Sequence, residues 1–152
     1  MRIHIGSDHA GFALKVAVIE HLRKAGHTVV DHGPKEFTPG DDYPAQSVAV
    51  ATAAVTDPDA LGLVIGGTGN GEQIAANKVE GARAALIWSV ESAELARVTT
   101  NANVAGLGAR MHDRAEAMEI IEAFLAAQFQ GDERHQRRIA QLTKYEKYGR
   151  LD

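Results

Sequence analysis

Thr68 and Glu72 are the two side chains whose surroundings indicate chemistry most clearly in this chain of 152 residues. They lie in the stretch GGTGNGE at residues 66–72, directly after the apolar run at 63–65. Glycines allow a ligand to approach the backbone, and the free N–H groups at the start of a helix favour negative charge. A carboxylate beside such an anion-binding loop suits a base that acts on the ligand. Glu72 could also simply place a favourable charge in the first helical turn, and G-x-G-x-G alone occurs in many nucleotide-binding loops.

Asp8 and His9 form a second candidate pair, in the polar stretch GSDHAG at residues 6–11. His9 could donate to a phosphate or a sugar oxygen, and Asp8 could orient a hydroxyl. Alternatively, Asp8 caps the following helix and His9 is incidental. Tyr43 could offer its phenol to the same site, or it could be a half-buried residue at the start of a helix before Pro44.

Three arginines are candidate phosphate ligands. Arg134 and Arg138 lie four residues apart, so a helix places them on one face, where two guanidinium groups could bind one phosphate. The alternative is a solvated, charged helix. Arg110 follows the apolar stretch at residues 104–107 and lies either at the functional edge of a sheet or on the surface.

Apolar runs alternate with helical patterns along the chain. Strands are predicted at 2–5, 28–31, 63–65, 82–88 and 104–107, and helices at 12–26, 43–57, from residue 73, 91–99, 115–129 and 134–148. Two of these helices have an apolar side that is expected to face inward. In the helix at 12–26 this side consists of Phe12, Val16, Ile19 and Leu22. In the helix at 115–129 it consists of Met118, Ile121, Phe124 and Leu125. The segment 32–42, rich in proline and glycine, is predicted to be a covering loop.

This alternation predicts an α/β fold: a doubly wound, Rossmann-like parallel sheet of five strands with helices on both faces and an extra C-terminal helix. The expected strand order is 2-1-3-4-5. The switch point then lies between the first and third strands, so the loops carrying Asp8 and Glu72 face each other across the crevice.

Composition limits the remaining possibilities. A chain of 152 residues with 45% hydrophobic content is expected to form a single domain, residues 1–152. Without cysteine it has no disulfide, thiolate nucleophile or cysteine-based metal site, and its seven histidines form no H-E-x-x-H pair, so we expect chemistry without a metal or cofactor. A net charge of −4 argues against nucleic acid as a partner. The absence of a signal-like start and of an apolar run near the roughly 18 residues of a membrane span predicts a cytoplasmic protein without a membrane partner.

Four motifs, taken together and in order, carry a resemblance to a known family. They are G-S-D-H-A-G at 6–11, G-G-T-G-N-G-E-Q-I-A-A-N-K at 66–78, G-x-R at 108–110 and E-R-H-Q-R-R at 133–138. Over nearly its whole length the chain resembles the ribose-5-phosphate isomerase B and galactose-6-phosphate isomerase family. The resemblance implies interconversion of aldose and ketose phosphates through a cis-enediolate.

The resemblance also assigns roles to residues. Asp8 and His9 would contact the sugar, Arg110, Arg134 and Arg138 would bind phosphate, and Thr68 would hold the enediolate together with Gly67, Gly69, Asn70 and Gly71. Members of the family are dimers or higher oligomers with shared sites. We therefore expect a homodimer or a dimer of dimers in which the C-terminal helix of residues 132–152 contributes to the interface.

Two features depart from the family pattern. Many members carry a catalytic cysteine where this chain has Gly66, whereas another branch uses a glutamate at Glu72, so Glu72 is the expected base. Thr99 and Thr100 replace the usual histidine and asparagine, of which the histidine opens the sugar ring. Because a tetrose 4-phosphate cannot close a furanose ring, this replacement predicts a preference for an open-chain substrate such as erythrose 4-phosphate or erythrulose 4-phosphate. Otherwise His9 or Tyr43 must open the ring of ribose 5-phosphate.

A different class of function is a nucleotide-binding or regulatory module without catalysis. Such a module would use the same glycine loop. However, no G-K-[ST] follows the glycines and no G-x-G-x-x-G follows the first strand.

Overall fold

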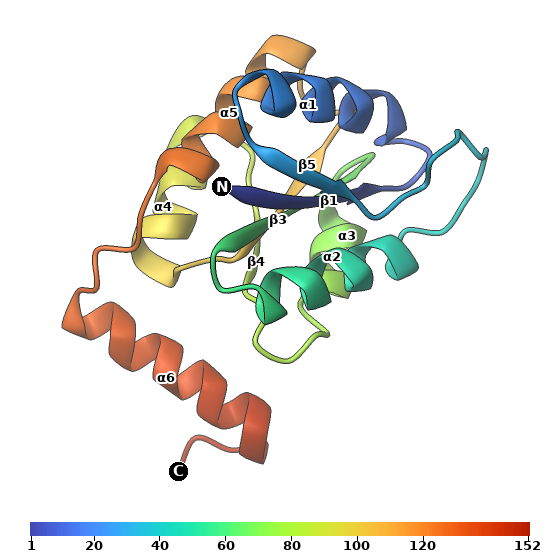
Figure 1. The fold of residues 1–152 in the computed structure, drawn as a ribbon. Helices are drawn as coiled ribbons and strands as arrows, with labels where there is room; N and C mark the ends of the chain where they lie inside the picture. The colour runs from blue at the N-terminus through green and yellow to red at the C-terminus, as the bar shows by residue number, and fades with distance from the viewer.

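The computed structural model describes residues 1–152 and contains one parallel five-stranded sheet and six helices (Figure 1). The strands are β1 (Arg2–Ser7), β2 (Thr28–Asp31), β3 (Ala60–Gly66), β4 (Ala84–Leu86) and β5 (Val104–Gly108). The helices are α1 (Phe12–Lys24), α2 (Pro44–Thr56), α3 (Asn70–Ala76), α4 (Val90–Thr100), α5 (Arg114–Ala126) and α6 (Glu133–Tyr148). The predicted doubly wound α/β class, with helices on both faces of the sheet, is confirmed.

The strand order is β2-β1-β3-β5-β4, and the expected order 2-1-3-4-5 is wrong at one edge. β5 is buried along its whole length and pairs with β3, whereas β4 has three residues, is partly exposed and forms the edge. Gly106 explains why β5 fits in the centre. A Cβ atom at Gly106 would lie 3.1 Å from the carbonyl oxygen of Gly69 and from Cβ of Gln73, so a larger residue would press against the loop and helix above it.

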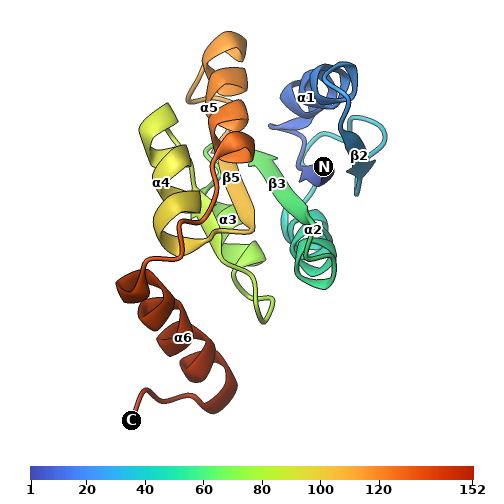
Figure 2. The same cartoon turned by 60° about the vertical axis from the view of Figure 1, so that its left-hand side comes forward.

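The handedness of the crossovers agrees with this order. Figure 2 shows α1, α4 and α5 on one side of the sheet and α2 and α3 on the other. The connections β1 to β2 and β4 to β5 both run toward the β2 edge, while β2 to β3 and β3 to β4 run toward the β4 edge. Because right-handed crossovers moving in opposite directions cover opposite faces, α4 must share its face with α1.

The core is divided between the two faces of the sheet. The larger cluster lies under α1, α4 and α5, and the smaller under α2 and α3. The inward side of α5 is as predicted, with Ile121, Phe124 and Leu125 buried and Met118 packed against them. The inward side of α1 differs, because Val16 is 49% exposed and the buried residues are Leu14, Lys15, Val18, Ile19 and Leu22.

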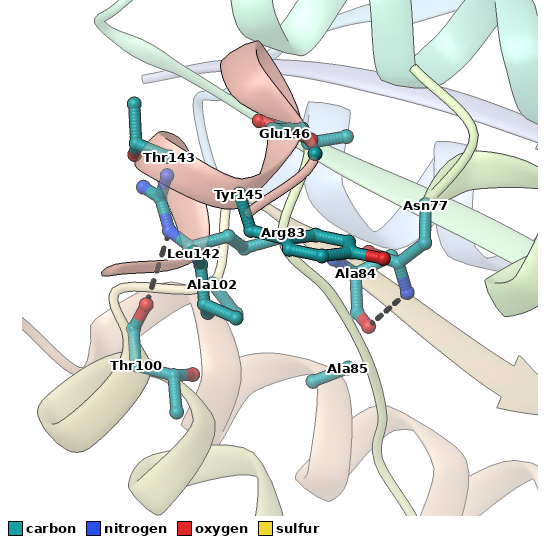
Figure 3. A pocket seen from close by; sticks show the side chains of 12 residues that line it. Asn77, Arg83, Ala84, Ala85, Thr100, Ala102, Leu142, Thr143, Tyr145 and Glu146 are labelled. Atoms are coloured by element: carbon teal, nitrogen blue, oxygen red, sulfur yellow. Dashed lines mark hydrogen bonds between the residues drawn. The ribbon is translucent and has the colours of Figure 1, made fainter. Parts of the chain in front are cut away.

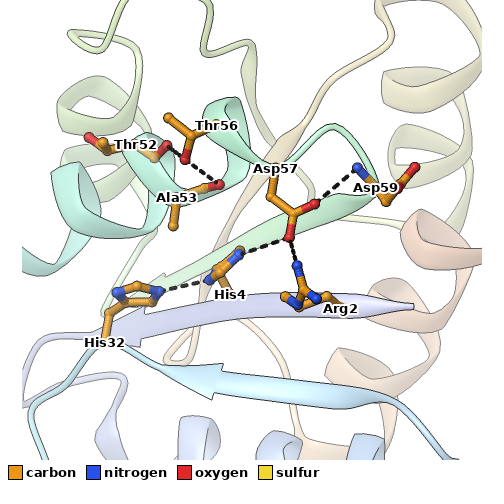
Figure 4. Close-up of polar contacts among 8 residues, drawn as sticks. All are labelled: Arg2, His4, His32, Thr52, Ala53, Thr56, Asp57 and Asp59. Atoms are coloured by element: carbon orange, nitrogen blue, oxygen red, sulfur yellow. Dashed lines mark hydrogen bonds and ion pairs between the residues drawn. The ribbon is translucent and has the colours of Figure 1, made fainter.

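Four polar side chains join β1 to the neighbouring segments on the face covered by α2 (Figure 4). His4 Nδ1 lies 2.9 Å from His32 Nε2, just beyond β2, and His4 Nε2 lies 4.0 Å from Asp57 Oδ2. Arg2 forms an ion pair with the same Asp57 carboxylate, after α2. Burial lowers the pKa of both His4 and His32. The charge of His32 lowers the pKa of His4 further, whereas the charge of Asp31 acts to raise that of His32.

α6 stands apart from the rest of the chain (Figure 1), and none of its residues is buried. It faces the end of α4 and the segment around β4 across a cavity of about 700 Å³, in which Tyr145 and Leu142 oppose Arg83, Thr100 and Ala102 (Figure 3). The carboxylate of Glu146 accepts a hydrogen bond from the backbone N–H of Gly81. Among the six helices, none combines the length and the apolar character that crossing a membrane requires.

Candidate active site

A cavity of about 220 Å³ lies where the carboxyl ends of β1, β3 and β5 meet. It is the crevice expected at the switch point between β1 and β3, where ligands bind in open α/β sheets. The loops after these strands supply most of its lining, and the start of α2 adds one aromatic residue. The lining residues are Asp8, His9, Ala10, Tyr43, Gly67, Thr68, Gly71, Glu72 and Arg110.

Gly69 gives the loop between β3 and α3 its shape. Its φ of 81° is in the left-handed region, and a Cβ atom there would lie 2.8 Å from the backbone carbon of Leu107. A residue with a side chain would therefore be strained and would collide with β5. The loop can follow β5 closely only because this residue is glycine, and α3 begins directly after it.

Glu72, in the first turn of α3, is only 4% exposed. Burial raises the pKa of its carboxyl group, and the charge and hydrogen bond of Asp8 raise it further, against an opposing hydrogen bond from its own backbone N–H. The carboxylate occupies the space beside Gly66, where a Cβ atom would fall 1.8 Å from Oε1. The group therefore has the burial and the pKa direction of a carboxylate base.

Asp8 borders the cavity, and its side chain closes the turn before α1 but does not cap the helix, whose N-cap is Gly11 without a side-chain cap. Its Oδ1 accepts a hydrogen bond of 3.0 Å from the backbone N–H of Gly11 at the start of α1. Its own backbone N–H donates to the carbonyl of Ile65, which ties the ends of β1 and β3 together. The helix cap expected as the alternative is therefore not formed by Asp8, and its contact with the sugar stays a prediction.

Thr68 and Arg110 face the same cavity from the two loops beyond β3 and β5. The Thr68 hydroxyl accepts hydrogen bonds of 3.3 Å from the backbone and side-chain nitrogens of Asn70, so its own proton is free to be donated. Arg110 is held by its backbone N–H, which donates to the carbonyl of Gly67. Its guanidinium forms no ion pair within the chain and can bind an anion.

His9 and Tyr43 complete the cavity. The His9 backbone N–H and ring Nδ1 both lie within hydrogen-bonding distance of Asp41 Oδ1, at 2.6 and 3.0 Å. The Tyr43 ring covers Gly71, where a Cβ atom would lie 2.6 Å from Cζ. Gly71 thus leaves room for the aromatic ring above α3.

Several predicted site residues do not line this cavity within one chain. Thr99 and Thr100 end α4, and their hydroxyls donate to the carbonyls of Leu95 and Ala96. Arg134 and Arg138 are exposed on α6, where the Arg134 guanidinium pairs with Asp132. Gly69 and Asn70 belong to the glycine loop but are not part of the lining, and Asn70 borders a neighbouring cavity with Thr68.

Asp41 and Lys15 are site-related residues that the sequence did not reveal. Lys15 is 1% exposed, although lysine in a helix normally faces water. Its ammonium pairs with Asp31 at 2.9 Å and donates to the carbonyl of Pro34, so it fixes the loop that carries Asp41. The only sequence signal was the position of Asp41 in the covering loop, two residues before Tyr43.

Known proteins resemble this chain over nearly its full length. A ribose-5-phosphate isomerase B from Mycolicibacterium paratuberculosis is 55% identical over 147 residues, which are 97% of this chain and 92% of that protein. The counterpart from Mycobacterium tuberculosis strain H37Rv is 53% identical and is covered to 91%. A crystal structure of ribose-5-phosphate isomerase B from Mycoplasma genitalium with bound ribulose 5-phosphate superposes with a TM-score of 0.92 at 45% identity, covering 97% of both chains.

The family model described as Ribose/Galactose Isomerase matches residues 3–142, which include every loop that lines the cavity and the arginines of α6. The high identities and the shared fold agree with that match. The resemblance carried by the four sequence motifs is therefore confirmed. The chain belongs to the ribose/galactose isomerase family and is an aldose–ketose isomerase.

Proposed function

We propose that this chain interconverts an aldose phosphate and its ketose by proton transfer, with Glu72 as the base. The observation that carries the proposal is the environment of Glu72: a buried carboxylate with a raised pKa that shares one cavity with the Thr68 hydroxyl and the unpaired Arg110. The reaction needs a base, a donor to the developing oxyanion and an anchor for phosphate, and these three groups supply them.

In the aldose-to-ketose direction, Glu72 removes the proton on carbon 2. The electrons of that C–H bond form the C1=C2 double bond, and the carbonyl electrons move to O1, which gives a cis-enediolate. Thr68 donates to this oxyanion. The proton on O2 is then transferred to O1. As C2=O2 forms, the electrons of the C1=C2 double bond take the proton from Glu72 at carbon 1, so that the base is regenerated.

Phosphate binding keeps the reacting carbons next to the base without taking part in the bond changes. Arg110 is one ligand for the phosphate. Arg134 and Arg138 are proposed as further ligands supplied by the partner subunit of a homodimer or a dimer of dimers, because on their own chain they do not line the cavity. Binding energy from the phosphate helps to fix the near-attack geometry at the remote carbons.

The substrate we propose is an open-chain tetrose 4-phosphate, interconverted as erythrose 4-phosphate and erythrulose 4-phosphate. Opening a sugar ring requires a group that takes a proton from the anomeric hydroxyl, and histidine suits that task near neutral pH. Thr99 does not titrate there, and its hydroxyl proton is donated to the Leu95 carbonyl. In a tetrose 4-phosphate the hydroxyl that would close a furanose ring carries the phosphate, so this substrate stays open and needs no such group.

The test compares kcat/KM for erythrulose 4-phosphate and ribose 5-phosphate in the natural protein and in Thr99→His. We expect the natural protein to favour the tetrose, and the substitution to improve ribose 5-phosphate turnover selectively. The Mycobacterium relatives bear the name ribose-5-phosphate isomerase B, so that activity is the reference for comparison. If the natural protein uses ribose 5-phosphate at least as efficiently as any tetrose phosphate, the open-chain proposal is wrong.

A further inference from the structure

Asp41 contacts His9 from a distant part of the sequence. Its Oδ1 accepts a 2.6 Å hydrogen bond from the His9 backbone N–H and lies 3.0 Å from the ring Nδ1. The other oxygen, Oδ2, is buried and has no hydrogen-bond donor. Apart from His9, no cationic or titratable base forms an ion pair with this carboxylate.

This contact decides which nitrogen of His9 faces a ligand. A carboxylate can only accept, so the Nδ1 that lies against it must carry a proton. Nε2 has no partner in the chain, and His9 lines the cavity. The same division between an anchored nitrogen and a presented nitrogen occurs where a carboxylate orients a histidine for catalysis or metal binding.

The charge of Asp41 matters as well as its position. Because Oδ2 has no hydrogen-bond donor, the His9 ring is the side chain that pairs with the negative charge of this partly buried carboxylate. A ring that carries a proton on Nε2 as well as on Nδ1 would donate a hydrogen bond from Nε2 to an anion.

An anionic group can reach His9 and Arg110 together. Both line the same cavity. Gly67 lies next to Arg110 and to the residue that follows His9: a Cβ atom there would lie 3.2 Å from a guanidinium nitrogen of Arg110 and 3.5 Å from Cβ of Ala10. Glu72 and Asp8 supply the negative charges of the cavity. The Glu72 carboxylate lies beside Gly66, and Asp8 Oδ2 lies 4.0 Å from His9 Nδ1, the nitrogen that also faces Asp41. His9 Nε2 and the Arg110 guanidinium are therefore the groups left to receive a phosphate.

The loop that carries Asp41 is anchored in the core. Lys15 of α1 pairs with Asp31 and binds the Pro34 carbonyl, and its ammonium lies 5.2 Å from the centre of the Phe12 ring. Phe12 in turn packs edge-on against Phe37 of the loop. These contacts hold the part of the loop that precedes Asp41 in place.

We infer that Asp41 is a positioning residue that fixes the His9 ring with Nδ1–H bound to its carboxylate and Nε2 presented to the phosphate of the substrate. The inference rests on the proposed function, because that function supplies the phosphate. A merely structural Asp41 would pin the loop through the backbone N–H of His9 and would leave the protonation of the ring unaffected.

The experiment uses the full chain labelled with ¹⁵N-histidine and inorganic phosphate as the probe, with the His9 signals assigned by their loss in His9→Gln. In the free protein we expect Nδ1 to carry a proton, and on addition of phosphate we expect both ring nitrogens to carry one. Asp41→Asn keeps the shape and an acceptor oxygen but removes the charge, so the Kd for phosphate should rise about 10-fold or more. With a sugar phosphate substrate the same change should raise KM and leave kcat nearly unchanged.

Asp42→Asn is the matched control, because Asp42 is exposed and forms no ion pair in the same loop. It should bind phosphate like the natural protein. Two results would overturn the inference: a His9 ring in the natural protein protonated only on Nε2, or an unchanged phosphate Kd in both Asp41→Asn and Asp41→Ala. If Asp41→Ala fails to fold, the Asn variant and the spectrum of the natural protein still decide. A protein that shows the His9 response to phosphate but turns over no sugar phosphate would refute the proposed function and leave the positioning role standing.

Discussion

Glu72 combines two properties that oppose each other in a folded protein. Its carboxylate is buried, which raises the pKa and makes it a stronger base, but an ionised buried carboxylate also costs stability. The sign follows from proton linkage. Because the folded-state pKa is raised, the folded chain binds this proton more readily than the unfolded chain, so the cost appears as pH rises above 4.5, the ordinary value, and through the folded-state pKa.

We therefore expect Glu72→Gln to separate activity from stability. The amide keeps the shape but cannot accept the proton, so kcat should fall by about 100-fold or more, while phosphate ligands still bind. At pH 7 the midpoint of thermal unfolding should not fall and should rise slightly. Glu80→Gln, which changes an exposed glutamate, is the control. Near-normal turnover by Glu72→Gln would remove this residue from its role as base.

Gly66→Ala tests whether the position of the Glu72 carboxylate matters. The new methyl group would fall 1.8 Å from Oε1, so the carboxylate must move, while the backbone of β3 can stay in place. We expect a loss of kcat approaching that of Glu72→Gln in a protein that still gives a cooperative thermal transition. Full activity in Gly66→Ala would mean that the carboxylate can work from a second position.

Sequence patterns predicted the residues that line the cavity with Glu72 but not Asp41, which contacts the lining residue His9. Glycines, a hydroxyl and a carboxylate after an apolar strand identify the loop, because each residue type is unusual there. Asp41 gave no such signal, since an aspartate in a loop rich in proline and glycine is common. Its role depends on a contact with His9 across 32 positions of sequence.

At the scale of elements, predictions based on local pattern succeeded, and among the predicted strand pairings only the order of the last two strands was wrong. The bounds of β2 and the existence of every helix follow from apolar spacing and from glycine and proline breaks. The order of β4 and β5 does not, because it depends on which strand tolerates burial on both faces. β4 has only three residues, and the glycines of β5 leave room for neighbouring segments. These features indicate the strand order only when the packing of α3 on β5 is known.

The contact between His4 of β1 and His32 beyond β2 predicts a pH dependence of stability. Burial lowers the pKa of both histidines below 6.5, and His32 lowers that of His4 further. As pH falls through 6.5, the unfolded chain takes up protons that the folded chain does not, so the free energy of unfolding decreases until the folded-state pKa values are reached.

Thermal unfolding measured from pH 8 to pH 5 should show this loss, and it should be smaller in His32→Gln. His135→Gln, which changes a histidine on α6 outside the pair, provides the comparison. An equally steep loss of stability in His32→Gln and in the natural protein would assign the pH dependence to other groups.

At the scale of the whole molecule, α6 is a helix that has no buried residue within its own chain. Its apolar side chains Leu142, Tyr145 and Tyr148 are each more than half exposed, and its arginines lie away from the cavity of their own chain. The sequence predicted this helix and its charge. It could not show which subunit its arginines serve, because that depends on assembly.

A mixing experiment tests whether sites are shared between subunits. Glu72→Gln and the double variant Arg134→Ala/Arg138→Ala should each be nearly inactive alone, for lack of the base and of the phosphate ligands. Co-expression with different tags should restore activity up to about a quarter of the natural level, because half of the random dimers would contain one intact site of two. Co-purified mixed oligomers without restored activity would show that each site is built from one chain.

The carboxylate that fills the space beside Gly66 also determines how the protein responds to oxidants. Relatives that use a cysteine at this position depend on a thiolate, which peroxide converts to sulfenic and then to higher acids. The carboxylate of Glu72 has no sulfur to oxidise or alkylate, and the chain contains no cysteine elsewhere. Hydrogen peroxide and iodoacetamide therefore have no thiol to attack in this enzyme. With Glu72 as the proposed base, we expect isomerisation to continue after a treatment that would inactivate a cysteine base.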